Sequence, residues 1–299
     1  MIDLNGVEKT EKIQKLEIEK QIDKLKEKDL IIRNEKSVVK ILNRIGYHRL
    51  SGYFQFFIEK STGDFHNHTT FEDIEKLYRF DSDLRLIYLE LMQEIEISLK
   101  SYLAEFITNS YGAYGWDKEI LFIGSNQTEK ESKRAKTNSL KWITMVKEKI
   151  HHFERDRANE RYKVLYNGNY PIEMITEMLD FGNISKLFKN LKPEDKQEIA
   201  KYYNNEIPYQ YLENWFEQFV SLRNICSHHA RIVGKNFQIK KSRELRKVRA
   251  NNLFALTLAA EMILADRREW KVFQAKLVLH LENNSEYAEL LGFPNDWNI

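Results

Sequence analysis

The 299 residues suffice for two average domains or one large one, and they carry 47 Lys and Arg against 45 Asp and Glu. A formal net charge of +2 excludes a polycation, so any nucleic-acid surface has to come from an uneven distribution of charge. Cys226 is the only cysteine, which excludes an intrachain disulfide and a thiolate metal cluster and fits a reducing compartment. No signal peptide and no apolar run of the roughly 20 residues that span a bilayer can be found, so we expect a cytoplasmic protein without membrane contact.

The composition favours helices. Only 11 Gly and 4 Pro interrupt a chain rich in Lys, Glu, Leu and Ile. We therefore expect an all-α protein that folds as one domain over residues 1–299. Within it we distinguish an N-terminal helical segment at 1–65 and a helical bundle at 66–299.

The N-terminal part is predicted to contain two helices. Residues 8–29 combine many charges with spaced apolar residues and predict an exposed amphipathic helix, and residues 38–45 predict a second, short one. The aromatic stretch 47–57 is punctuated by glycines and predicts a strand or a packed turn.

A long helical period starts at Phe71. From Ile74 to Leu103 the apolar residues recur every three or four positions, which predicts one buried stripe in the core of a bundle. Asp81 or Ser82 is a suitable N-cap, so we expect a fresh helix to start there.

The middle of the chain has clear punctuation. Residues 111–116 form a Gly and aromatic break, and 127–163 hold 11 Lys and Arg against 6 Asp and Glu. That stretch is either a solvated helix face or an arm that contacts RNA. Pro171 is expected to open a helix, residues 181–183 to interrupt it, and Pro193 to end the next segment.

The best-marked helix is predicted from about Pro208 to Val233. At roughly 100° per residue, Trp215, Phe219, Leu222, Cys226 and Val233 share one apolar face. His229 falls on the same face, and we expect it to be a core histidine that is hydrogen-bonded to a neighbour.

The opposite face of this helix is polar. Arg223, Asn224, Ser227, His228 and Arg231 lie within an arc of about 140°. The spacing of Arg223 and His228, an Arg-x4-His motif, resembles that of HEPN ribonucleases. From the motif alone, a polar surface on a structural helix remains the plainer alternative.

This polar face suits phosphodiester chemistry. An imidazole can take a proton from a ribose 2′-hydroxyl or give one to a leaving 5′-oxygen near neutral pH, which assigns that role to His228. Arg223 can hold the non-bridging phosphate oxygens, and Asn224 can orient the ring or the phosphate. Ser227, His229 and Arg231 are expected to support this site. One His per helix cannot easily be both acid and base, so a second copy of the chain is expected to face the first in a homodimer.

A basic run follows the helix. Residues 235–249 hold seven Lys and Arg against one Glu, with Phe237 as the nearby aromatic. They predict either phosphate contacts with RNA or a basic stretch that faces solvent. The candidate RNA-binding residues are Lys235, Lys240, Lys241, Arg243, Arg246 and Lys247. After them, the final helices are expected between 253 and 291.

Two histidine pairs are possible metal ligands. His66 with His68, and His151 with His152, stand in polar segments without a framework of carboxylates or cysteines. We therefore expect no metal and no cofactor.

Four stretches, in this order and spacing, resemble the Abi-like (AbiD/AbiF) abortive-infection family. They are Ile45 to Tyr53, Phe71 to Arg85 with Glu94-Ile95-Glu96, Pro171 to Leu187, and Leu222 to Arg231. His48 and Phe56 depart from the family pattern, which has Tyr and Pro at these places.

The resemblance implies a HEPN-like helical bundle with additional N-terminal and peripheral helices. It also implies RNA cleavage in phage defence by the Arg-Asn-x-x-x-His element, which falls on Arg223, Asn224 and His228. A bound small noncoding RNA or a toxin–antitoxin partnership would fit the family too. The alternatives are a non-catalytic RNA-binding or scaffold protein and an antitoxin-like interaction partner.

Overall fold

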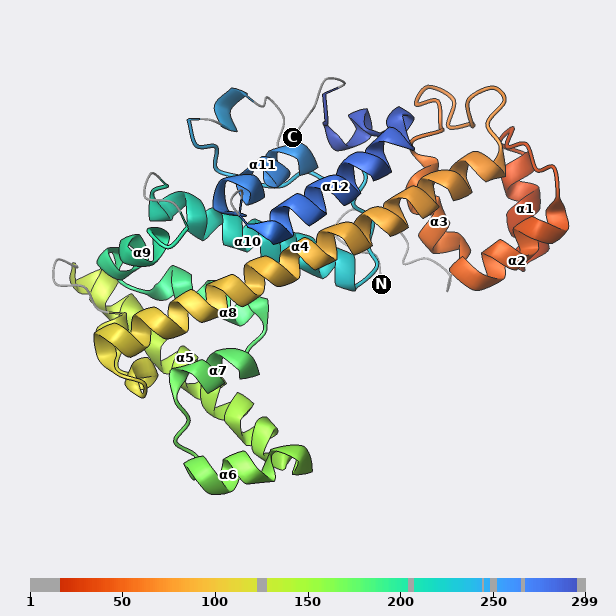
Figure 1. The fold of residues 1–299 in the computed structure, drawn as a ribbon. Coiled ribbons are helices and arrows are strands. Elements are labelled where there is room, and N and C mark those ends of the chain that lie inside the picture. The colour runs from red at the N-terminus through yellow and green to blue at the C-terminus, as the bar shows by residue number, and fades with distance from the viewer. Residues whose placement is uncertain are drawn as a thin grey trace. The chain divides into compact units, whose positions relative to one another are not determined.

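The computed structural model describes residues 17–122, 128–203, 207–243, 245–247, 252–264 and 267–294. The chain divides into two compact units, Met1–Ser82 and Asp83–Ile299. Figure 1 shows the regular structure as helices, and the β-type pairs within the described ranges are the isolated bridges Ile31 with Thr70 and Ile58 with Phe65. The all-α fold class is therefore confirmed, whereas the expected single domain with its segment at 1–65 stays a prediction.

The first unit contains three short helices and the start of a long one. The short helices are α1 (Ile18–Lys26), α2 (Glu35–Ile45) and α3 (Tyr47–Phe54). The two predicted N-terminal helices correspond to α1 and α2, although the beginning of the first prediction lies outside the described residues.

The strand or packed turn predicted at 47–57 is wrong, because most of this stretch is α3. Gly46 stands between α2 and α3 with a φ of 89°, a value that glycine adopts without strain, so one helix can end and another begin within two residues. In α3, Leu50, Tyr53 and Phe54 are three and four residues apart, and all three are buried.

The long helix α4 (Phe71–Tyr111) is continuous over 41 residues, so the fresh start predicted at Asp81 or Ser82 is wrong. Asp81 is fully buried, and its carboxylate accepts a hydrogen bond from the Tyr53 hydroxyl at 2.7 Å. The side chain that looks like an N-cap therefore serves a tertiary contact instead. The predicted stripe is confirmed as core, since Leu84, Leu91 and Leu99 are all buried.

In the second unit, α5 (Glu129–Arg155) begins with a capping box between Thr128 and Glu131. It is followed by α6 (Glu160–Tyr166). One face of α5 is buried through Trp142 and Val146, whereas most of its cations are exposed. The alternative that this stretch contacts RNA stays a prediction.

The helices that support the candidate site follow. They are α7 (Ile172–Met178), α8 (Phe181–Asn190), α9 (Pro193–Ala200), α10 (Tyr209–Ser227), α11 (Leu253–Leu264) and α12 (Arg268–Glu282). The helix predicted to open at Pro171 is confirmed, because Pro171 is the N-cap of the first of these helices. The break predicted at 181–183 lies instead at Leu179 and Asp180, and Pro193 begins a helix where it was expected to end one. Short 3-10 turns lie at Gly115–Asp117, Glu119–Leu121, Arg157–Asn159, Leu245–Lys247, Ser285–Tyr287 and Glu289–Leu291.

Helix α10 lies at the centre of the second unit and packs against α8, α9 and α11. Its Trp215, Phe216 and Phe219 are fully buried. On the other side of this core, α12 runs along α4, where the rings of Tyr88 and Phe273 meet edge to face at 5.2 Å (Figure 1). The centre of the core thus fixes the position and rotation of α10.

Candidate active site at the end of α10

Helix α10 ends at Ser227, six residues before the predicted end. The His229 N–H donates to the carbonyl of Cys226 at 3.1 Å, and the Ala230 N–H donates to that of Ile225 at 2.9 Å. With His228 as the C-cap and His229 at a φ of 55°, these bonds form a Schellman motif. The chain leaves the helix here because a left-handed residue cannot continue it.

The predicted apolar face is confirmed, but the placement of His229 on it is wrong. Trp215, Phe219, Leu222 and Cys226 are buried along α10, and Val233 is buried beyond its end. His229 is exposed, because the left-handed turn carries it off the helical face on which it was expected.

Arg223 lies half-exposed on α10 beside a sheltered carboxylate of α4. Its Nε is 4.0 Å from Oε2 of Glu96, and the exposed fractions of the two side chains are 34% and 14%. Glu96 also lies 3.2 Å from the ammonium of Lys100, one turn further along α4. The guanidinium thus lies at the outer limit of an ion pair with a carboxylate that also pairs with Lys100.

Sequence reasoning did not assign Glu96 and Lys100 to the site. A signal for Glu96 is present, because it belongs to Glu94-Ile95-Glu96 in the second of the four matched stretches. Its partner on α10 follows in the sequence by more than a hundred residues, so only the packing of α4 against α10 reveals the pair.

An open groove of about 570 Å³ lies between α4 and α10 at this point. Its lining residues are Leu89, Gln93, Glu94, Glu96 and Ile97 from α4, with Arg223 and Ser227 from α10. The groove combines one cation, two carboxylates and an exposed apolar side chain, Ile97. It is open enough to admit an extended ligand.

The remaining predicted residues surround the helix end. Asn224 and His228 are exposed, and no side-chain hydrogen bond or ion pair engages the His228 ring within the described part of the chain. The Ser227 hydroxyl donates to the carbonyl of Arg223 at 2.9 Å, so it caps a turn of the helix. Arg231 lies half-buried in the turn after α10, so its expected place on the polar face of this helix is wrong.

The candidate RNA-binding residues lie in the segment after α10. Lys235, Lys240, Arg243 and Arg246 are exposed, and Lys241 is half-buried. The side chain of Lys247 lies outside the described residues. Phe237, the aromatic residue of this run, is buried.

Neither histidine pair belongs to a metal cluster. No group of three or more His, Cys, Asp or Glu side chains within the described ranges is arranged to hold a metal ion. His66 instead lies 3.6 Å from the carboxylate of Glu59. The helices of the described ranges include none with the length and apolar character that crossing a bilayer needs.

The fold and the groove define an all-α protein with an open polar site at the end of a central helix. Over residues 40–233, well over half of the chain, the sequence matches the family described as Abi-like protein, and the chain belongs to this family. No curated protein and no solved structure matches the chain significantly.

Proposed function

We propose that this protein is a metal-independent endoribonuclease of the HEPN type that acts in the cytoplasm in abortive-infection defence against phage. Family membership supports the defence role, since the Abi-like proteins are associated with abortive infection. One observation carries the nuclease assignment: Arg223 lines an open groove, and His228 stands exposed at the end of the same helix.

In the proposed reaction, His228 takes the proton of a ribose 2′-hydroxyl, and the 2′-oxygen attacks the adjacent phosphorus. The bond from phosphorus to the 5′-oxygen breaks, and that oxygen receives a proton from an acid on its side. The products are a 2′,3′-cyclic phosphate and a 5′-hydroxyl. Arg223 binds the non-bridging oxygens as negative charge builds on them.

Glu96 and Lys100 position Arg223 in this scheme. The Glu96 carboxylate, 4.0 Å from the guanidinium, orients it toward the groove, and Lys100 restricts the conformation of the Glu96 side chain. A phosphate can compete for the guanidinium because a partly exposed ion pair at this distance is worth less than about 1 kcal/mol.

We propose a homodimer as the active species, because one imidazole per site cannot be base and acid at once. A second copy that presents the same polar face would supply the missing group, as an isologous interface does. The exposed Ile97 beside Arg223 offers apolar surface for such a contact.

The test is cleavage of a labelled RNA in EDTA by purified protein, with identification of the new ends. Arg223→Ala and His228→Ala should each lower the rate by about 100-fold or more while the protein stays folded, because both side chains reach solvent. Arg268→Ala and His152→Ala, which remove an exposed Arg and an exposed His elsewhere, should leave it unchanged. Loss of activity in EDTA, full activity in His228→Ala, or an active monomer would contradict the proposal.

A second candidate function is a non-catalytic RNA-binding or scaffold role with a small noncoding RNA. The exposed cations after α10 favour it. It predicts that the purified protein carries RNA, seen as absorbance at 260 nm and identified by sequencing, and that this RNA is intact and unaffected by His228→Ala.

A further inference from the structure

The segment after α10 folds back and is pinned to that helix through its backbone. The Asn214 side chain donates to the carbonyl of Gln238 at 2.9 Å and accepts from the N–H of Lys240 at 2.6 Å. Gln218 accepts from the N–H of Gln238 at 2.9 Å, and the Trp215 indole donates to the carbonyl of Lys240 at 2.8 Å. Four hydrogen bonds from three residues of one helix therefore fix the path of residues 238–240.

Apolar side chains of the same segment anchor it from below. Phe237, Ile239 and Leu245 are all buried, and Ser242 is buried among them. The cations that alternate with these anchors or flank them are exposed, namely Lys235, Lys240, Arg243 and Arg246. We call these four residues the basic strip.

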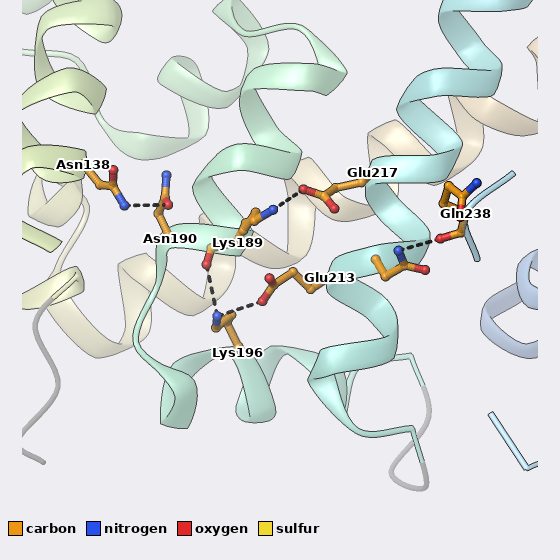
Figure 2. A network of polar contacts seen from close by, with 8 residues as sticks. Asn138, Lys189, Asn190, Lys196, Glu213, Glu217 and Gln238 are labelled. Carbon is orange, nitrogen blue, oxygen red and sulfur yellow. Dashed lines mark hydrogen bonds and ion pairs between the residues drawn. The ribbon is translucent and has the colours of Figure 1, made fainter. Parts of the chain in front are cut away.

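The basic strip differs from the other cations around α10 in how its charge is compensated. Lys189 pairs with Glu217, and Lys196 pairs with Glu213 at 2.9 Å, so α10 supplies a carboxylate to each (Figure 2). Within the described part of the chain, none of the four strip residues forms an ion pair. The one acidic residue of the run, Glu244, lies outside the described residues.

A row of cations without ion-pair partners among the described residues attracts a polyanion. The pinned backbone at 238–240 loses little conformational entropy on binding. We propose that the basic strip binds the phosphate backbone of a single nucleic-acid strand. This inference rests on the proposed function only in naming RNA as the strand in question.

The apolar residues of the segment decide between kinds of polyanion. Protein partners are usually anchored by exposed aromatic or apolar side chains, and membranes by inserted ones. Here Phe237, Ile239 and Leu245 are all buried, and only charge is presented. A phosphate backbone is the polyanion that can be bound by charge alone, without an apolar contact.

The same burial sets the character of the binding. Base stacking needs an exposed aromatic ring, and Phe237 offers none. The strip therefore contacts phosphates alone, so it binds without sequence preference and holds a DNA strand as well as an RNA strand. It acts on substrate affinity and not on the chemical step.

The test uses a fluorescein-labelled 20-nucleotide strand with 2′-O-methyl groups, which the proposed reaction cannot cut. Its dissociation constant is measured by anisotropy between 50 and 200 mM KCl for the full chain, for Lys240→Gln/Arg243→Gln, and for the control Arg268→Gln/Lys271→Gln. The control also removes one exposed Lys and one exposed Arg. Far-UV circular dichroism verifies that all three proteins fold.

The strip variant should bind several-fold more weakly at 50 mM KCl. The slope of the logarithm of its dissociation constant against the logarithm of the KCl concentration should be shallower by about 1.4, because each of the two lost phosphate contacts contributes about 0.7. The control should match the wild type, and a DNA strand of equal length should bind equally well. Equal binding by both variants, or tighter binding of polyglutamate or anionic vesicles than of the strand, would overturn the proposal.

The outcomes separate the strip from the nuclease. Strip-dependent binding by a protein that does not cleave RNA would leave the strip standing and remove the enzyme. If cleavage required His228 but the strip variant bound the strand as tightly as the wild type, the nuclease proposal would stand and the strip proposal would be overturned.

Discussion

At the scale of single residues, two adjacent histidines have unlike positions. His228 is the C-cap of α10 and keeps an exposed ring, whereas His229 takes the left-handed conformation that ends the helix. Glycine or asparagine usually occupies this position, but His is also enriched in it. The backbone of His229 thus has a structural role that is separate from any role of its ring.

Because His229 has a φ of 55°, we expect glycine at this position to give a more stable protein than alanine, the reverse of their order in a helix interior. Both His229→Gly and His229→Ala remove the ring, but only Ala keeps the Cβ that is strained in this conformation. We expect the Gly variant to be more stable by about 1 kcal/mol, measured by urea unfolding.

The matched control is Ser221, an exposed residue within the same helix. There Ser221→Gly should be less stable than Ser221→Ala by about 1 kcal/mol, because glycine weakens a helix interior. An Ala variant at 229 as stable as the Gly variant would contradict the left-handed assignment.

The half-exposed Arg223 and the exposed His228 could be placed from the sequence, because an apolar stripe of period 3.6 leaves the opposite face to polar residues. The end of the helix could not be placed. No Gly or Pro follows Ser227 before Gly234, so the usual stop residues are missing, and the left-handed His229 that ends the helix is a weak signal in the sequence. The partnership of Arg223 with Glu96 is likewise tertiary.

At the scale of elements, the long apolar periods of the sequence predicted helices correctly. The errors arose where a local feature, a capping side chain or a run of aromatic residues, was interpreted against the helical spacing around it. Asp81 has the side chain of an N-cap, yet it is buried against Tyr53 within a continuous α4. The aromatic stretch after Gly46 has strand-like composition, yet three buried residues at helical spacing make it α3. In both cases the tertiary contact prevails over the local preference.

Helices α8, α9 and α10 are joined by two ion pairs that differ in burial, which predicts different contributions to stability (Figure 2). The Lys196 ammonium is sheltered, with a side chain 9% exposed, and also donates to the carbonyl of Lys189 at 3.0 Å. Removing its partner by Glu213→Gln leaves a charge with reduced compensation, and we expect a loss of about 2 kcal/mol in the free energy of unfolding.

Glu217→Gln is the matched change on the same helix. Its pair with Lys189 is about 40% exposed on both sides, so water screens the charges, and the loss should stay below about 1 kcal/mol. Urea unfolding of both variants measures the difference. Equal losses would mean that burial does not decide the strength of these pairs.

At the scale of the whole molecule, the near balance of 47 basic and 45 acidic residues conceals local excess. Cations around α10 are paired on the side of α8 and α9 and uncompensated along the basic strip, as far as the described residues extend. The sequence indicated that run by composition. Only the structure reveals that it is pinned to a helix, because the anchoring residues, Asn214, Trp215 and Gln218, precede it by about twenty positions.

Buried phenols make the stability of the second unit sensitive to alkaline pH. Tyr88 is buried between α4 and α11, where its hydroxyl lies 2.5 Å from that of Thr257. Burial raises the pKa of Tyr88 well above its ordinary value, and it raises the pKa of Tyr203 in the same way. In the unfolded chain each phenol ionises near pH 10, whereas in the folded protein it stays protonated.

Above pH 10 the unfolded state therefore binds fewer protons than the folded state, so stability falls as the pH rises and is unaffected by these groups below pH 9. Each buried phenol contributes a loss of about 1.4 kcal/mol per pH unit. Tyr88→Phe should make the fall in the free energy of unfolding between pH 10 and 11.5 shallower by about that amount. At pH 8 the same substitution should lower the free energy of unfolding by about 1 kcal/mol, because the hydrogen bond to Thr257 is lost.

Tyr114→Phe is the control, because it removes an exposed phenol. Urea unfolding at intervals of half a pH unit separates the two variants, and lysine deprotonation is common to all three proteins and cancels in the comparison. If Tyr88→Phe and Tyr114→Phe declined with the same slope as the wild type, the Tyr88 phenol would have to reach water in the folded protein. The packing of α4 against α11 would then be looser than described.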